Sequence, residues 1–237
     1  MKKLTYQKTF ILIFTFFLFS CSDDDNSSGC SEDQAPVFVE LEGLLLVEAE
    51  AVDYGEGWRL VRDLSDATGS GYMRWEGENQ NNNPGVGLAT FNLEISTAGT
   101  YRFIWRSAVT EGDNPTEAND SWLRFPDADD YFGERNNGSI VYPKGTGKTP
   151  NPNGSSKDGW FKIYRSGTPL DFKWQAKTSD NDAHDIYVTF ESAGVYTMEI
   201  SGRSAGHAID KFVLYLEDLY SEQEATESIV FSEVSCR

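Results

Sequence analysis

Apolar and polar residues alternate along several short stretches of this chain. In the clearest stretch, Tyr101, Phe103 and Trp105 occupy every second position, and Arg102 and Arg106 fall on the opposite side. Successive side chains of a β-strand point to opposite faces of a sheet. The pattern therefore predicts a strand with its aromatic side chains in the core and two arginines facing away from it.

A second stretch repeats this pattern. Leu123 and Phe125 are predicted to point into the core, which leaves Trp122 and Arg124 on the opposite face. Further strands are predicted where runs rich in Val, Ile, Tyr and Phe lie between turn residues, at 87–95, 184–190, 194–203, 209–215 and, near the C-terminus, 229–234.

No amphipathic helical pattern of convincing length interrupts these segments. Residues 36–237 are therefore predicted to form an all-β domain, and their number suits a single β-sandwich. The stretch 126–160 is rich in Asp, Asn, Gly, Lys and Pro and is predicted to be a long loop. It is either a functional loop or a floppy insertion, and the sequence leaves both open.

The first twenty residues have the composition of a secretory signal. Three lysines accompany the apolar run 10–19, which is too short to cross a bilayer comfortably. Leu18-Phe19-Ser20-Cys21 resembles the bacterial lipoprotein box, in which the cysteine is lipidated and becomes the new N-terminus. The alternative is an ordinary cleaved signal.

The acidic residues directly after Cys21 resemble the signal that sends lipoproteins of Bacteroidota-type bacteria to the outer face of the outer membrane. We therefore expect residues 1–20 to be removed and Cys21 to carry a lipid anchor, so that the protein faces the cell exterior. Residues 21–35 are polar and acidic, which predicts a flexible tether because they have almost nothing apolar to bury.

The charge balance bears on possible partners. The chain has 20 Lys and Arg against 38 Asp and Glu, and residues 1–20 hold three of the lysines and no acid. Without them the formal charge falls from −18 to −21. Nucleic acid is excluded as a partner because phosphate binding requires a concentrated basic face. Solubility explains such a charge, although abundant carboxylates also suit calcium.

Besides the predicted lipidation site Cys21, the chain has two cysteines, Cys30 and Cys236. In an oxidising envelope, a pair placed near the two ends of a domain predicts a disulfide, with two unpaired thiols as the alternative. A metal site at either cysteine is not expected because neither has a second Cys or His at ligand spacing.

Carboxylates interrupt two apolar runs. Glu48 and Glu50 alternate at the end of an early run, and Asp210 lies at the start of the predicted strand 209–215. Alternating acids normally belong to a solvated strand face, and Asp210 could simply pair with Lys211 or a nearby arginine.

Taken together, however, Glu48-Ala49-Glu50 and the run from Ile209-Asp210 to Leu214 resemble family 6 and family 35 carbohydrate-binding modules, where an early E-A-E strand lies beside a late I-D-x-x-x-L strand. Shorter fragments match in the same order at 69–72, 98–102, 119–122, 193–196 and 201–204. The resemblance spans about residues 47–215. It implies a galactose-binding-like jelly-roll β-sandwich of two antiparallel sheets that binds carbohydrate.

The resemblance also implies a structural calcium ion, held by Glu48, Glu50 and Asp210 with help from backbone carbonyls near Ser70 and Gly71. Calcium prefers several oxygen ligands at about 2.3–2.6 Å. It would also neutralise three carboxylates that otherwise repel one another where strands meet.

A sugar presents apolar faces and a rim of hydroxyl groups, so its site combines an exposed aromatic ring with polar side chains. Each candidate aromatic residue could instead be a packing residue of the core. The candidates lie near turns or face outward by alternation, and they are Tyr72, Trp75, Trp122, Trp160 and Trp174.

Polar candidates are Arg106, Asn119, Asp120, Arg203 and His207. Alternation is expected to send Arg106, Arg124 and Arg203 to one face, away from the core. The resemblance places the strands of Arg106 and Arg203 in one sheet and implies that His207 lies in a loop at the rim. Arginine suits vicinal hydroxyls, carboxylate or sulfate. The alternative is that Asp120 only pairs with one of these arginines. The sequence does not decide between the loop tips and the concave face.

Three functions remain open. The preferred hypothesis is a monomeric, non-catalytic lipoprotein that binds polysaccharide at the cell surface and favours neutral sugars. An enzyme is the second, a glycosidase or a polysaccharide lyase with His207 or Tyr72 as the base, but no pair of catalytic carboxylates stands out. The third is an adhesin that binds another surface protein.

Overall fold

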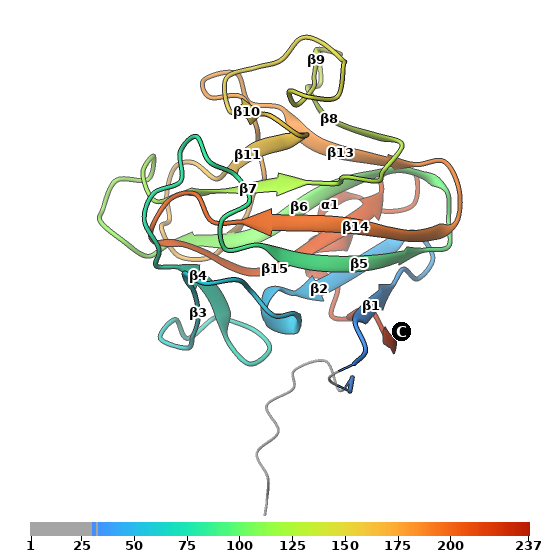
Figure 1. The fold of residues 1–237 in the computed structure, drawn as a ribbon, viewed down its shortest axis with the longest axis horizontal. Helices are drawn as coiled ribbons and strands as arrows, with labels where there is room; N and C mark the ends of the chain where they lie inside the picture. The colour runs from blue at the N-terminus through green and yellow to red at the C-terminus, as the bar shows by residue number, and fades with distance from the viewer. Residues whose placement is uncertain (1–29, 32) are drawn as a thin grey trace, which may run out of the picture.

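The structure, a computed structural model, describes residues 30, 31 and 33–237 (Figure 1). The predicted signal, the predicted lipidation site Cys21 and most of the tether lie outside the described residues. The described chain forms two β-sheets that enclose one main apolar core, which confirms the predicted all-β jelly-roll sandwich. The strand pairs are mostly antiparallel, with β1 (Pro36–Val39) and β5 (Ala89–Ile95) running in parallel.

One sheet has seven strands within the described part of the chain. In order across the sheet they are β10 (Ser155–Ser156), β11 (Trp160–Tyr164), β7 (Asp120–Arg124), β14 (Gly194–Ser201), β5, β1 and β16 (Val234–Cys236). On β7 and β11, Leu123, Phe161 and Ile163 belong to the core. Trp122 and Lys162, which face each other across the two strands, therefore lie on the outer face of this sheet.

The other sheet has nine strands among the described residues. Its main path is β3 (Trp58–Val61), β4 (Tyr72–Trp75), β15 (His207–Leu216), β6 (Gly99–Val109), β13 (Asp185–Phe190), β8 (Asp130–Glu134) and β9 (Ile140–Val141). In addition, β2 (Leu44–Glu48) pairs with β15, and β12 (Lys173–Trp174) pairs with β6.

Two short helices accompany the sheets. The 3-10 helix η1 (Ala49–Ala51) follows β2, and α1 (Glu222–Glu227) begins at a capping box formed by Ser221 and Glu224. No helix in the ranges that the structure describes is long and apolar enough to span a membrane.

The core between the sheets is largely aromatic. Phe103 and Phe212 stack with ring centroids 5.9 Å apart, and Phe91 meets Phe212 edge-on at 5.0 Å. Tyr101 and Trp105 are fully buried beside them, as their alternation predicts. The period-two pattern was therefore a reliable guide to which side chains face inward.

Two predicted segments differ from the structure. The stretch 126–160 is not one loop, because it contains β8, β9 and β10 and contributes Tyr131 and Val141 to the core. The C-terminal strand is shorter and later than 229–234 predicts, since only Val234–Cys236 pairs as β16. Apolar residues at 229–231 instead remain exposed outside the sheet.

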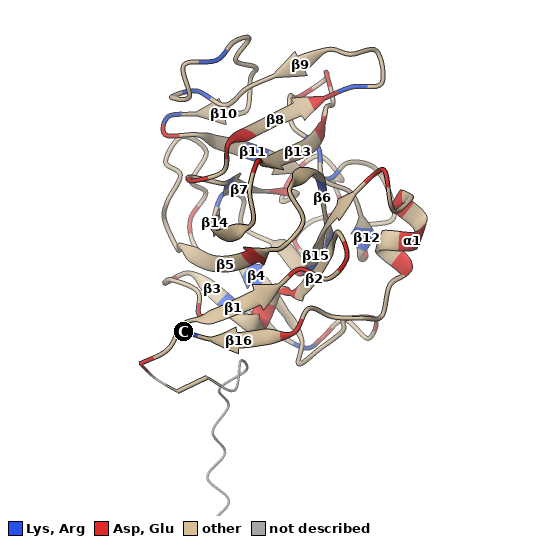
Figure 2. Cartoon of the chain, turned by 90° about the vertical axis from the view of Figure 1, so that its right-hand side faces the viewer, with Lys and Arg blue, Asp and Glu red and all other residues tan. Residues whose placement is uncertain are grey.

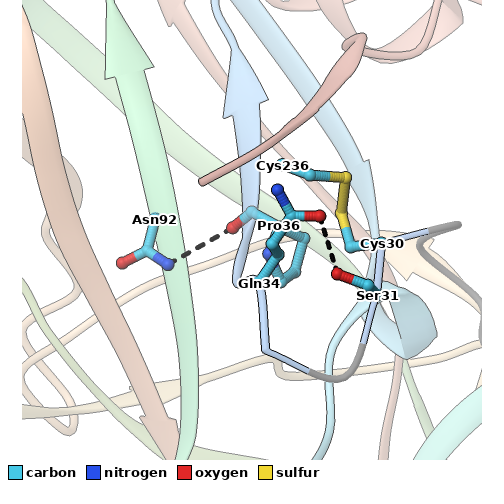
Figure 3. Close-up of a disulfide and its surroundings, with 6 residues drawn as sticks. All are labelled: Cys30, Ser31, Gln34, Pro36, Asn92 and Cys236. Atoms are coloured by element: carbon cyan, nitrogen blue, oxygen red, sulfur yellow. Dashed lines mark hydrogen bonds between the residues drawn. A yellow bond between two sulfur atoms is a disulfide. The ribbon is translucent and has the colours of Figure 1, made fainter.

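The predicted disulfide between Cys30 and Cys236 is present (Figure 3). It lies beside β1, where Pro36 pairs with Cys236 across the β1–β16 ladder. The side-chain amide of Asn92 on β5 donates a hydrogen bond to the Pro36 carbonyl at 3.2 Å. The disulfide and the strand pairing thus hold the N-terminal and C-terminal segments of the domain together.

Candidate functional site

The three carboxylates predicted to hold calcium lie together beneath the loop that precedes β4. The Thr68 hydroxyl donates to Glu48 at 2.9 Å and to Asp210 at 3.2 Å. The Ser70 backbone N–H donates to Glu50 at 2.6 Å. The alternation of Glu48 and Glu50 predicts that both lie on one strand. Glu50 instead lies in η1, whose turn directs its carboxylate toward the same loop.

Burial is the main feature of these carboxylates. It raises the pKa of the Glu48 carboxyl to about 7, an effect that the Thr68 hydrogen bond opposes and the charges of Glu50 and Asp210 increase. Burial likewise raises the pKa of Glu50, and its Oε2 atom is buried without a hydrogen-bond partner. A Cβ added to Gly69, which has a φ of +59°, would lie 2.2 Å from Glu50 Oε1, so the loop packs tightly over this oxygen.

Arg106 supplies a positive charge to this cluster. Its Nη1 atom lies 2.7 Å from Asp210 Oδ2, and its Nη2 atom lies 2.8 Å from Asp66. Asp210 reaches this position because the pairing of β15 with β6 shifts register there. In residues 30–31 and 33–237, no group of three or more His, Cys, Asp or Glu side chains is placed so that it could hold a metal ion.

The expectation that Arg106, Arg124 and Arg203 share one face is wrong for Arg106. Arg106 lies on β6 in the nine-stranded sheet, whereas Arg124 lies on β7 and Arg203 follows β14, both in the seven-stranded sheet. Alternation within a strand shows which face a side chain takes but not which sheet the strand joins, and the error has that cause.

Two adjoining hollows of about 940 and 410 Å³ lie where the outer face of the seven-stranded sheet meets the surrounding loops. They share Asn81, Asp180 and Arg203 as walls, and we call them together the polar groove. Loop segments at 79–81, 111–118, 180–181 and 203–205 complete the larger hollow. The groove therefore draws on both the strand face and the loops.

Asp120 is the central polar residue of this groove. Its Oδ1 atom accepts hydrogen bonds at 2.5 Å from Arg203 and from the Ser204 hydroxyl, and its Oδ2 atom lies 3.9 Å from Lys162 Nζ. Asn119, also predicted, lines the groove, and its side-chain amide donates to the Arg165 carbonyl. The alternative that Asp120 pairs with an arginine is confirmed for Arg203.

Several groove residues were not singled out from the sequence. Lys162 on β11 is buried, forms an ion pair with Asp180, and lies 5.2 Å from the centre of the Tyr164 ring. The alternation of Trp160, Lys162 and Tyr164 could have placed them on the outer face. Their proximity to Asp120 depends on the pairing of β11 with β7, which no local pattern reveals.

Trp122 points outward as predicted, and so does Trp160, which was predicted to lie near a turn, but neither is an exposed ring. Each residue is only 3% exposed, and an arginine lies over each ring. The Arg203 guanidinium lies 5.2 Å from the Trp122 ring centre, and the Arg124 guanidinium lies 4.6 Å from that of Trp160. Trp122 lines the smaller hollow of the polar groove, whereas Trp160 does not.

The other aromatic candidates lie elsewhere. Tyr72 and Trp75 belong to β4 rather than to a turn, and both are buried: Tyr72 donates its hydroxyl proton to Asp63, and Trp75 is part of the main core. Trp174 on β12 is half-buried against a second apolar cluster. Burial by packing explains why the rings of Tyr72 and Trp75 cannot stack on a ligand in this conformation, and Trp174 lies outside the polar groove.

His207 is the first residue of β15, not a loop residue at the rim, and it is fully buried. Its Nδ1 atom lies 2.8 Å from the Ser121 hydroxyl, and its ring packs 5.2 Å from that of Trp105. Burial, with a smaller contribution from the charge of Arg165, lowers the pKa of His207 to about 3. The imidazole is therefore neutral and out of reach of a bound ligand.

Comparison with solved structures returns carbohydrate-binding modules. A family 35 module from Cellvibrio japonicus is 16% identical with a TM-score of 0.40, over 73% of this chain and 93% of that chain. The family 6 module of the Cellvibrio mixtus lichenase, solved in complex with cellotriose, is 13% identical with a TM-score of 0.40, over 73% and 98% of the two chains.

The GH26-CBM35 β-(1,4)-mannanase of Podospora anserina is 18% identical with a TM-score of 0.42, over 74% of this chain. The match covers 28% of the mannanase, so this chain corresponds to less than a third of that protein. No family model and no curated protein matches the sequence.

Proposed function

We propose that the protein binds polysaccharide through the polar groove and does not catalyse a reaction on it. The observation that carries the proposal is the cluster of Asp120, Arg203 and Lys162 beside Trp122 at the wall of an open hollow. Carboxylate, amide and guanidinium groups at fixed positions suit vicinal hydroxyls. The resemblance of the sequence fragments to carbohydrate-binding modules supports the same function.

The covered indole changes the expected mode of binding. Arg203 lies over Trp122, so a sugar either meets the guanidinium or displaces it to reach the ring. Hydrogen bonds to hydroxyl groups are then the main interactions in the closed conformation, and stacking follows only if Arg203 moves. A groove of this kind selects sugars by the arrangement of their hydroxyls.

A non-catalytic function is supported by the position of the two candidate bases. Tyr72 and His207 are both buried, and neither lines the polar groove. Burial and the hydrogen bond to Asp63 raise the pKa of Tyr72, which further disfavours a phenolate base.

Within this function we propose a preference for neutral glycans. Arg106, Arg124 and Arg203 each form an ion pair with a carboxylate, so none is a free cation. One observation favours anionic glycans instead: Lys144 and Lys157 line the smaller hollow, and neither side chain has an ion-pair partner among the described residues.

Affinity electrophoresis at low and high salt, against one neutral and one uronate-containing polysaccharide, tests these proposals. We expect retardation by the neutral polysaccharide that hardly changes with salt, because it does not depend on screened charges. Binding confined to the acidic polysaccharide, released by salt and lost in Lys144→Gln/Lys157→Gln, would overturn the neutral preference. Failure to bind any glycan of a broad array would overturn sugar binding in favour of an adhesin.

We also propose that the protein is a lipid-anchored monomer at the cell surface, attached through Cys21. The proposal rests on the lipoprotein-like sequence around Cys21. Metabolic labelling with a fatty-acid analogue tests it, with Cys21→Ser as the variant that should lose both label and membrane association. Surface exposure is then tested by accessibility to protease added to intact cells.

Finally, we propose that calcium binds at Glu48, Glu50 and Asp210 and stabilises the fold. The Glu50 Oε2 atom is buried without a hydrogen-bond partner, and burial raises the pKa of Glu48. A bound cation would give that oxygen a partner and would stabilise the charged form of both carboxylates. The fit is incomplete, since the described carboxylates are not placed as a group of three that could hold a metal ion, and Arg106 already pairs with Asp210. Calcium therefore has to enter beside Glu48 and Glu50, with Asp210 joining only if its ion pair with Arg106 opens.

A further inference from the structure

A second hollow, of about 810 Å³, lies apart from the polar groove. It is bounded by the turn between β1 and β2, the turn between β15 and α1, and residues 228–233 after α1. We call it the C-terminal groove. Its apolar lining residues include Leu41, Leu44, Leu219, Ile229, Val230 and Phe231.

The groove concentrates apolar surface. Leu41 is 60% exposed, Leu219 58% and Ile229 87%, and Val230 and Phe231 are exposed as well. These five are the majority of the nine large hydrophobic side chains that are exposed in the described part of the chain. Single exposed apolar residues are common, but a contiguous group at a hollow marks a binding surface.

The walls of the groove are held in place by hydrogen bonds. Ser232 donates its backbone N–H to the Leu46 carbonyl at 2.9 Å and accepts a bond from the Leu46 N–H through its hydroxyl at 3.2 Å. Val39 donates to the Glu233 carbonyl at 2.9 Å. Ser232 and Glu233 are therefore bonded to β2 and β1, next to the exposed residues Ile229 and Val230.

Acidic side chains surround the apolar surface. Glu42, Glu224, Glu227 and Glu233 line the groove, and no Lys or Arg among the described residues does so. Figure 2 shows acidic positions on α1, and two of its residues, Glu224 and Glu227, line the groove. The ammonium group of Lys211 lies 5.3 Å from the Phe231 ring centre. The groove thus combines exposed apolar side chains with four glutamates, which we call its rim.

We propose that the C-terminal groove binds a segment of another protein in which apolar side chains alternate with Lys or Arg. Apolar side chains would cover Leu219, Ile229 and Phe231, and the basic ones would reach the glutamates at the rim. The rim disfavours the other occupants. An anionic lipid surface would face four glutamates, and a second copy docked through the same groove would bring eight glutamates together.

The proposal does not depend on sugar binding, since the groove shares no lining residue with the polar groove. It is tested with three short fluorescein-labelled peptides, in which Leu alternates with Lys, Leu with Glu, and Ser with Lys. Binding to the purified protein is followed by fluorescence polarisation at physiological salt. We expect the Leu–Lys peptide to bind at least about tenfold more tightly than either of the others.

Two pairs of variants localise the binding. Ile229→Ser/Phe231→Ser should weaken the Leu–Lys complex at least about tenfold, whereas Leu60→Ser/Val195→Ser, which removes exposed apolar residues elsewhere, should leave it unchanged. Glu42→Gln/Glu227→Gln should weaken it several-fold, and Glu56→Gln/Glu191→Gln should not. Melting curves confirm that each variant is folded, and these substitutions are at exposed positions.

Several results would overturn the proposal. Equal binding by all variants would show that the general negative charge attracts the peptide. Equal binding of the Leu–Glu peptide, or no binding of any peptide, would remove the basis for a basic partner. If the protein pellets with anionic vesicles and Ile229→Ser/Phe231→Ser abolishes this, the groove binds lipid. If the protein dimerises in a sedimentation experiment and the same variant abolishes the dimer, the groove binds a second copy of the chain.

Discussion

The guanidinium of Arg203 lies over the indole of Trp122, 5.2 Å from the ring centre, and the same guanidinium is bonded to Asp120. The aromatic ring, the cation and the carboxylate at this wall of the polar groove are therefore one unit. A change in any of the three alters what a ligand meets there.

The two outward-facing tryptophans provide a matched pair of variants. Both are covered by an arginine, but only Trp122 lines the polar groove. We expect Trp122→Ala to weaken oligosaccharide binding about tenfold or more, equivalent to about 1.4 kcal/mol, and Trp160→Ala to leave it unchanged. Isothermal titration calorimetry on both variants measures this, and equal losses would place the sugar elsewhere.

Calcium should raise the melting temperature if it binds at the carboxylate cluster. Linkage predicts about 2.7 kcal/mol of added stability at a calcium concentration of one hundred times Kd. Glu50→Gln should abolish this response. Glu40→Gln is the matched control, because Glu40 is also buried but accepts hydrogen bonds from the backbone at Ser96 and Thr97. No calcium response in the wild-type protein would leave Arg106 as the counter-charge of the cluster.

Acid should destabilise the fold through His207. Burial lowers its pKa in the folded state to about 3 from an ordinary value of 6.5. Only the unfolded chain binds a proton between these values, so this contribution to stability is present above pH 6.5 and is lost as the pH falls toward 3. The slope is at most about 1.4 kcal/mol per pH unit.

Denaturant unfolding of the wild-type protein and of His207→Asn between pH 7 and pH 4 measures this effect. The difference between the two profiles is the informative quantity, because the raised pKa of Glu48 acts with the opposite sign below pH 7. We expect His207→Asn to be less stable at pH 7 but to lose less stability on acidification. Parallel profiles would show that His207 is not the titrating group.

Removal of the disulfide should destabilise the protein without changing its fold. Cys30 and Cys236 are 206 residues apart, and closing so long a loop stabilises by about 3–5 kcal/mol in the chain-entropy model. We expect Cys30→Ser/Cys236→Ser to unfold at a correspondingly lower denaturant concentration with an unchanged circular dichroism spectrum. Thiol labelling of the folded, unreduced wild-type protein at both positions would contradict the bond itself.

Much of the fold could be predicted because the strand pattern is local. Alternation correctly placed Leu123 and Phe125 in the core and Trp122 on the outside, since each strand shows its two faces in its own sequence. The position of the disulfide followed similarly from two cysteines at the ends of the domain. These inferences needed no knowledge of which strands are neighbours.

The candidate site was harder to predict because contacts between distant segments form it. Trp75 lies near Gly77, which suggests a turn, yet this glycine makes room for the Trp75 ring, as do the distant Gly57 and Gly202: a Cβ added at any of the three would lie within 2.5 Å of the indole. Lys162 reaches Asp120 only through the pairing of β11 with β7. No pattern within either segment contains that information.

The bond between Cys30 and Cys236 also determines how the domain responds to mechanical force. A force applied between a residue before Cys30 and a residue after Cys236 passes through the two sulfur atoms and bypasses the sandwich. The reason is that all the strands lie within the loop that the bond closes between Cys30 and Cys236. Reduction would release up to roughly 700 Å of chain for the 206 intervening positions. A pull from Cys30 against a ligand held in the polar groove is different, since that force runs across the seven-stranded sheet and loads the ladders between its strands.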